Sequence, residues 1–502
     1  MKAITESEVE EAAIEIFTEL GYDYVFGPDI SPDGSNLERE SYDEAVLIER
    51  LRSSIDNLNP KLSNEVKEDA LKKVLKTLSP DQITNNETFH EMLVNGVDVE
   101  YRNHEGQVVG TKVWLIDFNN PDKNRFLAVN QYSVIEQNRS RRADIVLFVN
   151  GLPLVLIELK NPADEEATLK TAYDQIQTYK AEIPSLLKYN EIIIATDGSD
   201  AKAGTLTSPW EWMLPWKTID GVNKASDALP QLEVILQGMC NKKVLLDLIQ
   251  NFTVFEKEEK GTKKKIAAYH QYHAVNKAVL STIKASGPRG DKRCGVVWHT
   301  QGSGKSLSMV FFTGKVVLSM DNPTIVVLTD RNDLDDQLFS TFTRCKDILR
   351  QTPVQADKRE DLKRYLSVAA GGIVFTTIQK FLPEQKGDRY PLLSDRRNIV
   401  VIADEAHRSQ YDFIDGFARH IRDALPNASF IGFTGTPIER EDRNTAMVFG
   451  NYIDIYDIEE AVQDGATVPI YYENRLAKLS MNENEMPLLD SEFEEVTEGE
   501  EV

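Results

Sequence analysis

The stretch DIVLFVNGLPLVLIELKNP, residues 144–162, joins two apolar arms and carries charged residues at one end of each arm. Both arms consist of strand-forming residues, and the Asn-Gly pair between them is a strong hairpin signal. Asp144 nevertheless begins the first arm, and Glu158 and Lys160 interrupt the end of the second. The pattern predicts a β-hairpin with two carboxylates and an ammonium at its open end.

The register of this hairpin decides whether the three charged side chains meet. Opposite residues of an antiparallel pair share a face, as do residues two apart on one strand. A three-residue loop centred on Gly151 sets Asp144 opposite Glu158, whereas a two-residue turn sends Glu158 to the other face. We therefore expect the three-residue loop, with Lys160 on the same face as both carboxylates.

Three such groups have the chemistry of phosphodiester cleavage. Asp144 and Glu158 can hold Mg²⁺ with its waters, and Lys160 can orient or activate one of those waters. A charged strand edge exposed to solvent is the alternative interpretation.

Length and composition are those of a globular intracellular protein. The chain has 502 residues, enough for about three domains, and its hydrophobic content of 41% supports sizeable cores. No apolar run reaches the roughly 20 residues that span a bilayer, and the acidic N-terminus does not resemble a secretory signal. The three scattered cysteines fit a reducing compartment, so we expect a cytoplasmic protein without membrane association.

The formal net charge of −24 argues against a nucleic-acid coat protein. It does not exclude an enzyme that acts on DNA, because binding needs only a local basic groove. We expect that groove near Lys263, Lys264, Lys265 and Arg293. Residues 481–502 contain nine acidic residues and no Lys or Arg, which predicts a solvated or disordered tail.

The first half of the chain alternates helical and strand patterns. We expect helices over 5–20 and 40–80, strands between 90 and 160, a helix over 165–181 and a strand over 191–196. A Trp-rich region follows over 205–245, and the pattern leaves open whether it is a connector or a DNA contact.

The second half repeats a strand-then-helix pattern. Short β-branched runs such as TIVVLTD and NIVVIAD are followed by polar loops, and most by helical stretches, which predicts a parallel sheet covered on both faces. The charged segment KEEKGTKKK, residues 257–265, reads as a linker between the halves.

A phosphate-binding loop opens this second half. In HTQGSGKS, residues 299–306, the glycines allow backbone N–H groups to point at phosphate oxygens. Lys305 would neutralise the β- and γ-phosphates and Ser306 would hold Mg²⁺. The general pattern has glycine where His299 stands, and an ordinary Gly/Ser turn is the alternative. The candidate nucleotide-binding residues are Thr300, Gly302, Ser303, Gly304, Lys305 and Ser306.

An acidic strand end supplies the partner of this loop. About a hundred residues later, the run NIVVIADEAH ends in Asp404, Glu405 and His407. Asp404 can hold Mg²⁺ through water, and Glu405 can polarise an attacking water. Parallel strands bring both elements to the same carboxyl edge of the sheet.

These motifs resemble superfamily 2 helicases and translocases over about 260–440. The resemblance implies that Gln271 reads adenine, that His407 belongs to the nucleotide site, and that strand-end residues contact DNA or couple hydrolysis to movement. Those strand-end residues are Thr329, Arg331, Thr377, Gln379, Thr434, Gly435 and Thr436. Helix capping is the alternative for the threonines.

The hairpin resembles the PD-(D/E)xK nuclease signature, written here as Asp144, Glu158 and Lys160. Gln175 and Tyr179 match the Gln-xxx-Tyr element of the RecB-like branch, and at i, i+4 they share one helix face. A half-buried helix stripe is the alternative. The same resemblance implies a further acid on the early helix, for which Glu8 and Glu11 are both candidates.

A nuclease of this kind before such a motor resembles the R subunit of type I restriction enzymes. The resemblance implies an α/β chain with a mixed nuclease sheet flanked by helices over 1–245 and a parallel RecA-like P-loop domain over 246–450. It implies Mg²⁺ and ATP as cofactors, and double-stranded DNA, methyltransferase and specificity subunits as partners. A type I restriction endonuclease would cleave DNA after ATP-driven translocation.

The segment 451–502 is expected to be the link and the start of a second motor lobe, ending in the acidic tail. A motor needs two lobes, so we expect this chain to bind ATP weakly and not to translocate. Two other interpretations remain open: a non-catalytic remnant that binds DNA or partners, and a stand-alone repair nuclease-helicase.

Overall fold

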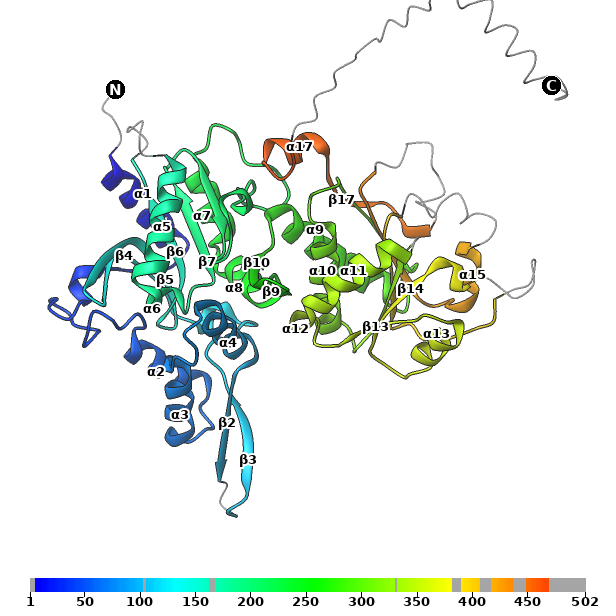
Figure 1. Cartoon of the computed structure of the whole chain (residues 1–502), viewed down its shortest axis with the longest axis horizontal. Helices are drawn as coiled ribbons and strands as arrows, with labels where there is room; N and C mark the ends of the chain where they lie inside the picture. Colours follow the sequence, from blue (N-terminus) through cyan, green and yellow to red (C-terminus); the bar gives the residue numbers. More distant parts are fainter. Residues whose placement is uncertain are drawn as a thin grey trace, which may run out of the picture. The chain divides into compact units, whose positions relative to one another are not determined.

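The computed structural model describes residues 5–102, 105–161, 168–329, 332–381, 390–406, 417–436 and 448–468 (Figure 1). Residues up to Thr467 belong to one compact unit. The acidic tail over 481–502 lies outside the described residues. No helix in the described ranges has both the length and the apolarity needed to cross a membrane.

The first half contains a six-stranded sheet with helices packed against it. Its elements are α1 (Glu6–Glu19), β1 (Asp23–Phe26), α2 (Ile48–Leu58), α3 (Asn64–Leu75), α4 (Gln82–Asn95), β2 (Val97–Arg102), β3 (Val108–Val113), β4 (Phe126–Glu136), β5 (Arg139–Val149), β6 (Leu152–Leu159), α5 (Leu169–Glu182), α6 (Pro184–Leu187), β7 (Ile192–Thr196), β8 (Ala201–Gly204), α7 (Gln231–Met239) and α8 (Lys242–Asn251).

This sheet has the order β1-β4-β5-β6-β7-β8 and is mixed, because β1–β4 and β6–β7 are parallel and the other neighbours antiparallel. All eight residues of β6 are buried, as expected for a strand covered on both faces. Helix α5 packs against β6 and β7, and α1 packs against β1 and β4. The predicted mixed sheet flanked by helices is confirmed.

The helix predicted over 40–80 is instead two helices. Helix α2 ends at Leu58, directly before Asn59 and Pro60, and α3 begins after Ser63, whose side chain accepts a hydrogen bond from Val66 N. Proline cannot continue a helix, and serine is a preferred N-cap, so the sequence contained both the stop and the new start.

The second half contains a seven-stranded sheet in which every neighbouring pair is parallel, in the order β13-β14-β12-β15-β16-β11-β17. The parallel sheet predicted from the sequence is therefore confirmed. The elements are β9 (Thr253–Glu258), β10 (Gly261–Ile266), α9 (Tyr269–Ser286), β11 (Arg293–His299), α10 (Lys305–Ser319), β12 (Thr324–Thr329), α11 (Asn332–Arg344), α12 (Lys346–Leu349), β13 (Pro353–Gln355), α13 (Arg359–Leu366), β14 (Ile373–Thr377), β15 (Ile399–Ala403), α15 (Phe417–Ala424), β16 (Ser429–Thr434), β17 (Tyr452–Tyr456) and α17 (Ile458–Gln463).

Strand β17 corrects one expectation. It lies in the segment predicted to lead into a second lobe, yet it pairs with β11 and completes the edge of the first parallel sheet. Apolar residues alternate too weakly in YIDIY, residues 452–456, to reveal this pairing.

The predicted linker is also wrong, because residues 257–265 belong to the antiparallel pair β9–β10. Lys264 is fully buried, and its Nζ lies 2.6 Å from Glu191 Oε2 and 2.9 Å from Asn86 Oδ1. The pair β9–β10 is thereby attached to α4 and to the residue before β7. The prediction failed because it assumed that this charged segment is exposed to solvent.

The four cations expected to line a basic groove are all paired with carboxylates. Lys263 pairs with Glu258, Lys264 with Glu191, Lys265 with Glu256 and Arg293 with Asp291. The structure therefore contradicts an open basic groove at this place.

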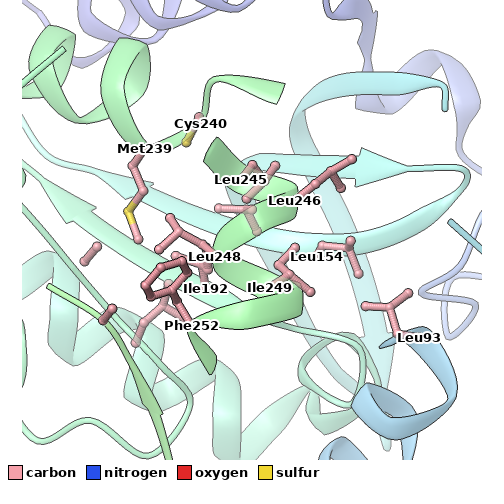
Figure 2. Packing of buried hydrophobic residues seen from close by; sticks show 14 of the residues in the cluster. Leu93, Leu154, Ile192, Met239, Cys240, Leu245, Leu246, Leu248, Ile249 and Phe252 are labelled. Carbon is pink, nitrogen blue, oxygen red and sulfur yellow. The ribbon is translucent and has the colours of Figure 1, made fainter. Parts of the chain in front are cut away.

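Helix α8 joins the core of the first half. Leu245, Leu246, Leu248 and Ile249 are buried, and Figure 2 shows them in one apolar cluster with Leu93, Leu154 and Ile192 from α4, β6 and β7. The proposed domain boundary at 245 thus falls inside a helix that packs on the first-half sheet.

Candidate functional site

The hairpin turn differs from the expected one, although its consequence is as expected. Asn150 and Gly151 have positive φ values of 55° and 87° and form a two-residue turn, with Val149 paired to Leu152. The register then shifts, because Leu147 pairs with Val155 and leaves Leu154 as an extra residue. The predicted three-residue loop is wrong, and a β-bulge provides the one-residue shift in register that the loop was expected to provide.

Beyond the bulge, Ile145 pairs with Ile157, and the same register continued by one pair sets Asp144 opposite Glu158. Asp144 Oδ2 accepts a hydrogen bond of 2.7 Å from Leu159 N. Lys160 Nζ lies 2.8 Å from Glu158 Oε1. The structure thus brings together the three charged residues predicted from the sequence.

Helix α5 brings the fourth and fifth predicted residues. Tyr179 Oη lies 3.0 Å from Glu158 Oε2 and 2.9 Å from the Arg142 carbonyl oxygen. Burial raises the pKa of Tyr179, and the side chain of Gln175 opposes this rise. The tyrosine therefore fixes the orientation of Glu158 and ties it to the backbone of β5.

Both carboxyls are buried, with exposed fractions of 8% for Asp144 and 2% for Glu158. Burial raises the pKa of Asp144 to about 6, against the lowering effects of the Leu159 N–H and Lys160. Burial and then the charge of Asp144 raise the pKa of Glu158 to about 8. For Lys160, burial is outweighed by the charges of Glu158 and Asp144, so its pKa is raised. The site is short of positive charge, which favours binding of a cation.

Helix α1 brings to Asp144 two acids other than the candidates Glu8 and Glu11. Glu8 accepts hydrogen bonds from Thr5 N and Thr5 Oγ1 and so caps its own helix. The helix acids whose charges raise the pKa of Asp144 are Glu6 and Glu10. They are one turn apart, a spacing that could have singled them out.

Glu10 is held in place by β4. Its two carboxylate oxygens accept hydrogen bonds from Asn130 Nδ2 and Gln131 Nε2. Gln131 has a positive φ of 55°, a conformation that non-glycine residues rarely adopt.

The phosphate loop has the predicted strand–loop–helix context. Strand β11 leads into Gly302 and Gly304, both with φ of 84°, and α10 begins at Lys305. Ser303 Oγ donates a hydrogen bond of 2.6 Å to Thr300 O within the loop. Ser306 occupies the first turn of α10, where a hydroxyl could reach a phosphate-bound metal.

Gln271, for which the resemblance implied contact with adenine, lies beside this loop. Its Oε1 accepts from Ala268 N at 3.0 Å, and its Nε2 donates to Gly304 O at 3.0 Å. A Cβ on Gly304 would lie 2.6 Å from Gln271 Nε2, so only glycine allows this approach. These contacts make Gln271 a support of the phosphate loop.

Asp404 and Glu405 follow β15. Burial, then the charge of Glu405, raises the pKa of Asp404 to about 6, and burial lowers the pKa of Lys305 against the pull of both carboxylates. Glu405 has a positive φ of 47°, which marks a constrained position. Gly435 lies against the lysine, since a Cβ there would be 2.7 Å from Lys305 Nζ.

The other motif residues stand at strand ends of the same sheet. Thr329 pairs with Thr377 across β12 and β14, Gln379 follows in a short 3₁₀ turn, and Thr434 ends β16. Thr434 Oγ1 accepts a hydrogen bond from Thr436 N at 3.2 Å. Arg331 and His407 lie outside the described residues.

A cavity of about 240 Å³ borders the phosphate loop and is lined in part by the Trp-rich region. Its walls include Gly302, Gly304, Gln271, Trp212 and Trp216. The buried Trp216 ring packs on the rings of Tyr269 and Tyr272. The Trp-rich region thus connects the first-half fold to the phosphate-loop domain.

Two family models match the chain. The N terminus of the type I restriction enzyme R protein matches residues 3–212, and the SWI2/SNF2 ATPase matches residues 270–502. A solved fragment of a putative HsdR subunit of a type I restriction enzyme from Vibrio vulnificus is 19% identical, with a TM-score of 0.28, over 69% of this chain and 57% of that one.

The type I restriction enzyme HindI endonuclease subunit of Haemophilus influenzae is 44% identical over 99% of this chain and 48% of its own length. The putative MjaIXP endonuclease subunit of Methanocaldococcus jannaschii is 38% identical over 98% of this chain and 48% of its own length. The chain spans about half the length of these curated relatives. On the two family models and the identity to these curated relatives over nearly all of this chain, the chain belongs to the family of type I restriction enzyme endonuclease (R) subunits.

Proposed function

We propose that this chain carries the Mg²⁺-dependent nuclease and the first ATP-binding motor lobe of a type I restriction endonuclease. The observation that carries the proposal is the group of Asp144, Glu158 and Lys160, joined at one end of β5 and β6. The proposed substrate is a phosphodiester of double-stranded DNA.

The donor set fits a hard divalent cation. Two buried carboxylates whose pKa values burial raises are the oxygen ligands that Mg²⁺ prefers, and they lack a compensating second cation besides Lys160 among the described residues. When bound, Mg²⁺ would polarise the phosphate and lower the pKa of a coordinated water.

The chain's own groups would orient this reaction. The Leu159 N–H fixes Asp144, and the Tyr179 hydroxyl fixes Glu158 Oε2. Lys160 holds its proton beside Glu158, where it can align a water or stabilise charge on the phosphate. Glu10, held by β4, is proposed as the third acid of the site.

In the second half, Lys305 and the loop N–H groups would bind the phosphates of ATP. Asp404 would hold Mg²⁺ through water, and Glu405 would polarise the attacking water. We propose a nuclease domain that extends through α8, past the expected boundary at 245, and a first motor lobe whose sheet β17 extends to Tyr456. Translocation, the methyltransferase and specificity subunits, and a cytoplasmic location are proposed from the family.

The test is cleavage of supercoiled plasmid DNA by the chain with Mg²⁺, with and without ATP, beside Glu158→Ala and Lys305→Ala. If Glu158→Ala abolishes nicking and Lys305→Ala does not, the nuclease assignment is supported. Such a result would also mean that nicking does not require ATP. Undiminished nicking by Glu158→Ala would refute the assignment.

A further inference from the structure

Strand β5 carries arginines directly before its catalytic end. Arg139, Arg141 and Arg142 occupy three of the first four positions of the strand, in a chain with a net charge of −24. This is a local concentration of cations beside Asp144.

Alternation along the strand separates these arginines. Arg142 precedes Asp144 by two residues on β5, and β4 pairs with β5 in the same register on either side of Asp144, at Ala143 and at Ile145, so the two side chains leave the same face. Arg141 leaves the other face, where it forms an ion pair with Glu182 of α5. Arg142 is therefore the arginine that shares a face with Asp144.

Arg142 is also positioned and available. Its carbonyl oxygen lies 2.9 Å from Tyr179 Oη, the same hydroxyl that contacts Glu158. Its side chain is exposed, and within the described residues its guanidinium has no ion pair or hydrogen bond. A rigid backbone thus presents an uncompensated cation about 6.8 Å along the strand from Asp144.

A duplex that approaches this site meets several negative charges. Asp144, Glu158, Glu6 and Glu10 would repel its phosphates, and a bound cation offsets that repulsion only at the scissile group. The neighbouring phosphates need another cation on the same face. A guanidinium suits this role because its fork of donors matches two phosphate oxygens.

We infer that the Arg142 guanidinium binds a backbone phosphate of duplex DNA next to the phosphodiester held at Asp144 and Glu158. The contact sets the strand's position without reading its sequence. This inference rests on the proposed nuclease function, for which it names the DNA-binding side of the site.

The experiment measures the binding of the full chain to a fluorescent 30-base-pair duplex by anisotropy, over a series of salt concentrations, with Ca²⁺ in place of Mg²⁺. Arg142→Ala should weaken binding roughly tenfold and reduce the slope of log K against log salt by about one, because one phosphate contact is lost. Arg142→Lys should retain the slope and part of the affinity.

Arg141→Ala is the matched control, since it lies on the same strand and its charge already faces Glu182. The inference would be overturned if Arg142→Ala left the affinity and the salt slope unchanged. It would also be overturned if Arg141→Ala lowered both as much as Arg142→Ala does. Absence of salt-dependent binding by the wild-type chain would do so as well.

Asp144→Asn separates this inference from the proposed function. Wild-type DNA binding that depends on Arg142, together with failure of the wild-type chain to cleave in Mg²⁺, would uphold the contact and refute the nuclease. Cleavage lost in Asp144→Asn, with binding indifferent to Arg142→Ala, would uphold the nuclease and refute the contact.

Discussion

Glu158 connects the groups of the proposed nuclease site. It is 2% exposed, and it contacts Lys160 through one carboxylate oxygen and Tyr179 through the other. A carboxylate with both oxygens directed in this way is pre-oriented, so its chemistry depends on charge more than on shape. Substitutions that keep the shape therefore isolate the contribution of the charge.

Glu158→Gln should lower DNA cleavage at least 100-fold, because the amide keeps the size of the side chain and loses its metal-binding charge. The thermal unfolding temperature of the metal-free chain at neutral pH should not fall, since the amide replaces a carboxyl that its raised pKa keeps largely protonated. The measurement is plasmid cleavage beside a melting curve. Glu182→Gln, which alters an acid on α5 paired with Arg141, is the control and should cleave normally.

Metal binding should depend steeply on pH. The pKa values of about 6 for Asp144 and about 8 for Glu158 lie above those of unfolded carboxyls, so metal affinity should rise between pH 6 and 8 with release of protons. Calorimetry in buffers of different ionisation enthalpy counts those protons. Proton release that is equal in wild type and Glu158→Gln would contradict the assignment.

The same raised pKa values affect stability. A carboxyl whose folded pKa is raised contributes stability below its unfolded pKa, near 4, and loses it as pH rises through the folded value. The metal-free chain should therefore unfold more easily at pH 8 than at pH 5. Glu158→Gln should reduce this difference in melting temperature.

At the scale of the element, the hairpin shows how a turn and a bulge act together. Asn150 and Gly151 form the two-residue turn that their sequence favours, which alone would put Glu158 on the wrong face. The extra residue, Leu154, restores the alignment of Glu158 with Asp144. Leu154 is fully buried in the cluster with α8, so packing stabilises the bulge.

Gly151→Ala tests this turn. Gly151 has a φ of 87°, and an added Cβ would lie 2.5 Å from the Leu47 carbonyl oxygen, so the variant should lose roughly 2 kcal/mol or more of unfolding free energy. Urea denaturation gives the value. Gly110→Ala, where a Cβ meets no atom within 4 Å and φ is not positive, should leave stability nearly unchanged.

At the scale of the whole molecule, buried charges attach the β9–β10 pair to the first-half sheet. Lys264 and Glu191 have no exposed side-chain surface, and His90 Nδ1 lies 3.0 Å from the same Glu191 oxygen. Burial lowers the pKa of Lys264 against the opposing charge of Glu191. Such a pair contributes little when complete and costs much when one partner is lost.

Lys264→Met should therefore lower the unfolding free energy by roughly 3–5 kcal/mol, because Glu191 remains as an uncompensated buried charge. Adding Glu191→Gln should recover part of that loss. Lys263→Met, which removes a partly exposed ion pair with Glu258, should change stability by less than about 1 kcal/mol. Equal losses in the two lysine variants would show that burial does not matter here.

The sequence by itself determined the local chemistry of this protein. Asp404 directly follows β15, and Gly302 lies in the loop after β11. These positions, the helix stop at Pro60 and the face shared by Gln175 and Tyr179 follow from rules that act over a few residues or from the parallel order of strands. For that reason both candidate sites could be named before any fold was known, and the structure groups their described residues accordingly.

Only the tertiary structure decided the rest. The bulge at Leu154, the partnership of Lys264 with Glu191, the place of β17 beside β11, and the approach of Glu6 and Glu10 to Asp144 all join residues far apart in the chain. A charged or weakly alternating segment has the same local pattern whether it is solvated or packed. The partners of such a segment depend on which other elements are buried against it, and the local periodicity of the sequence does not predict them.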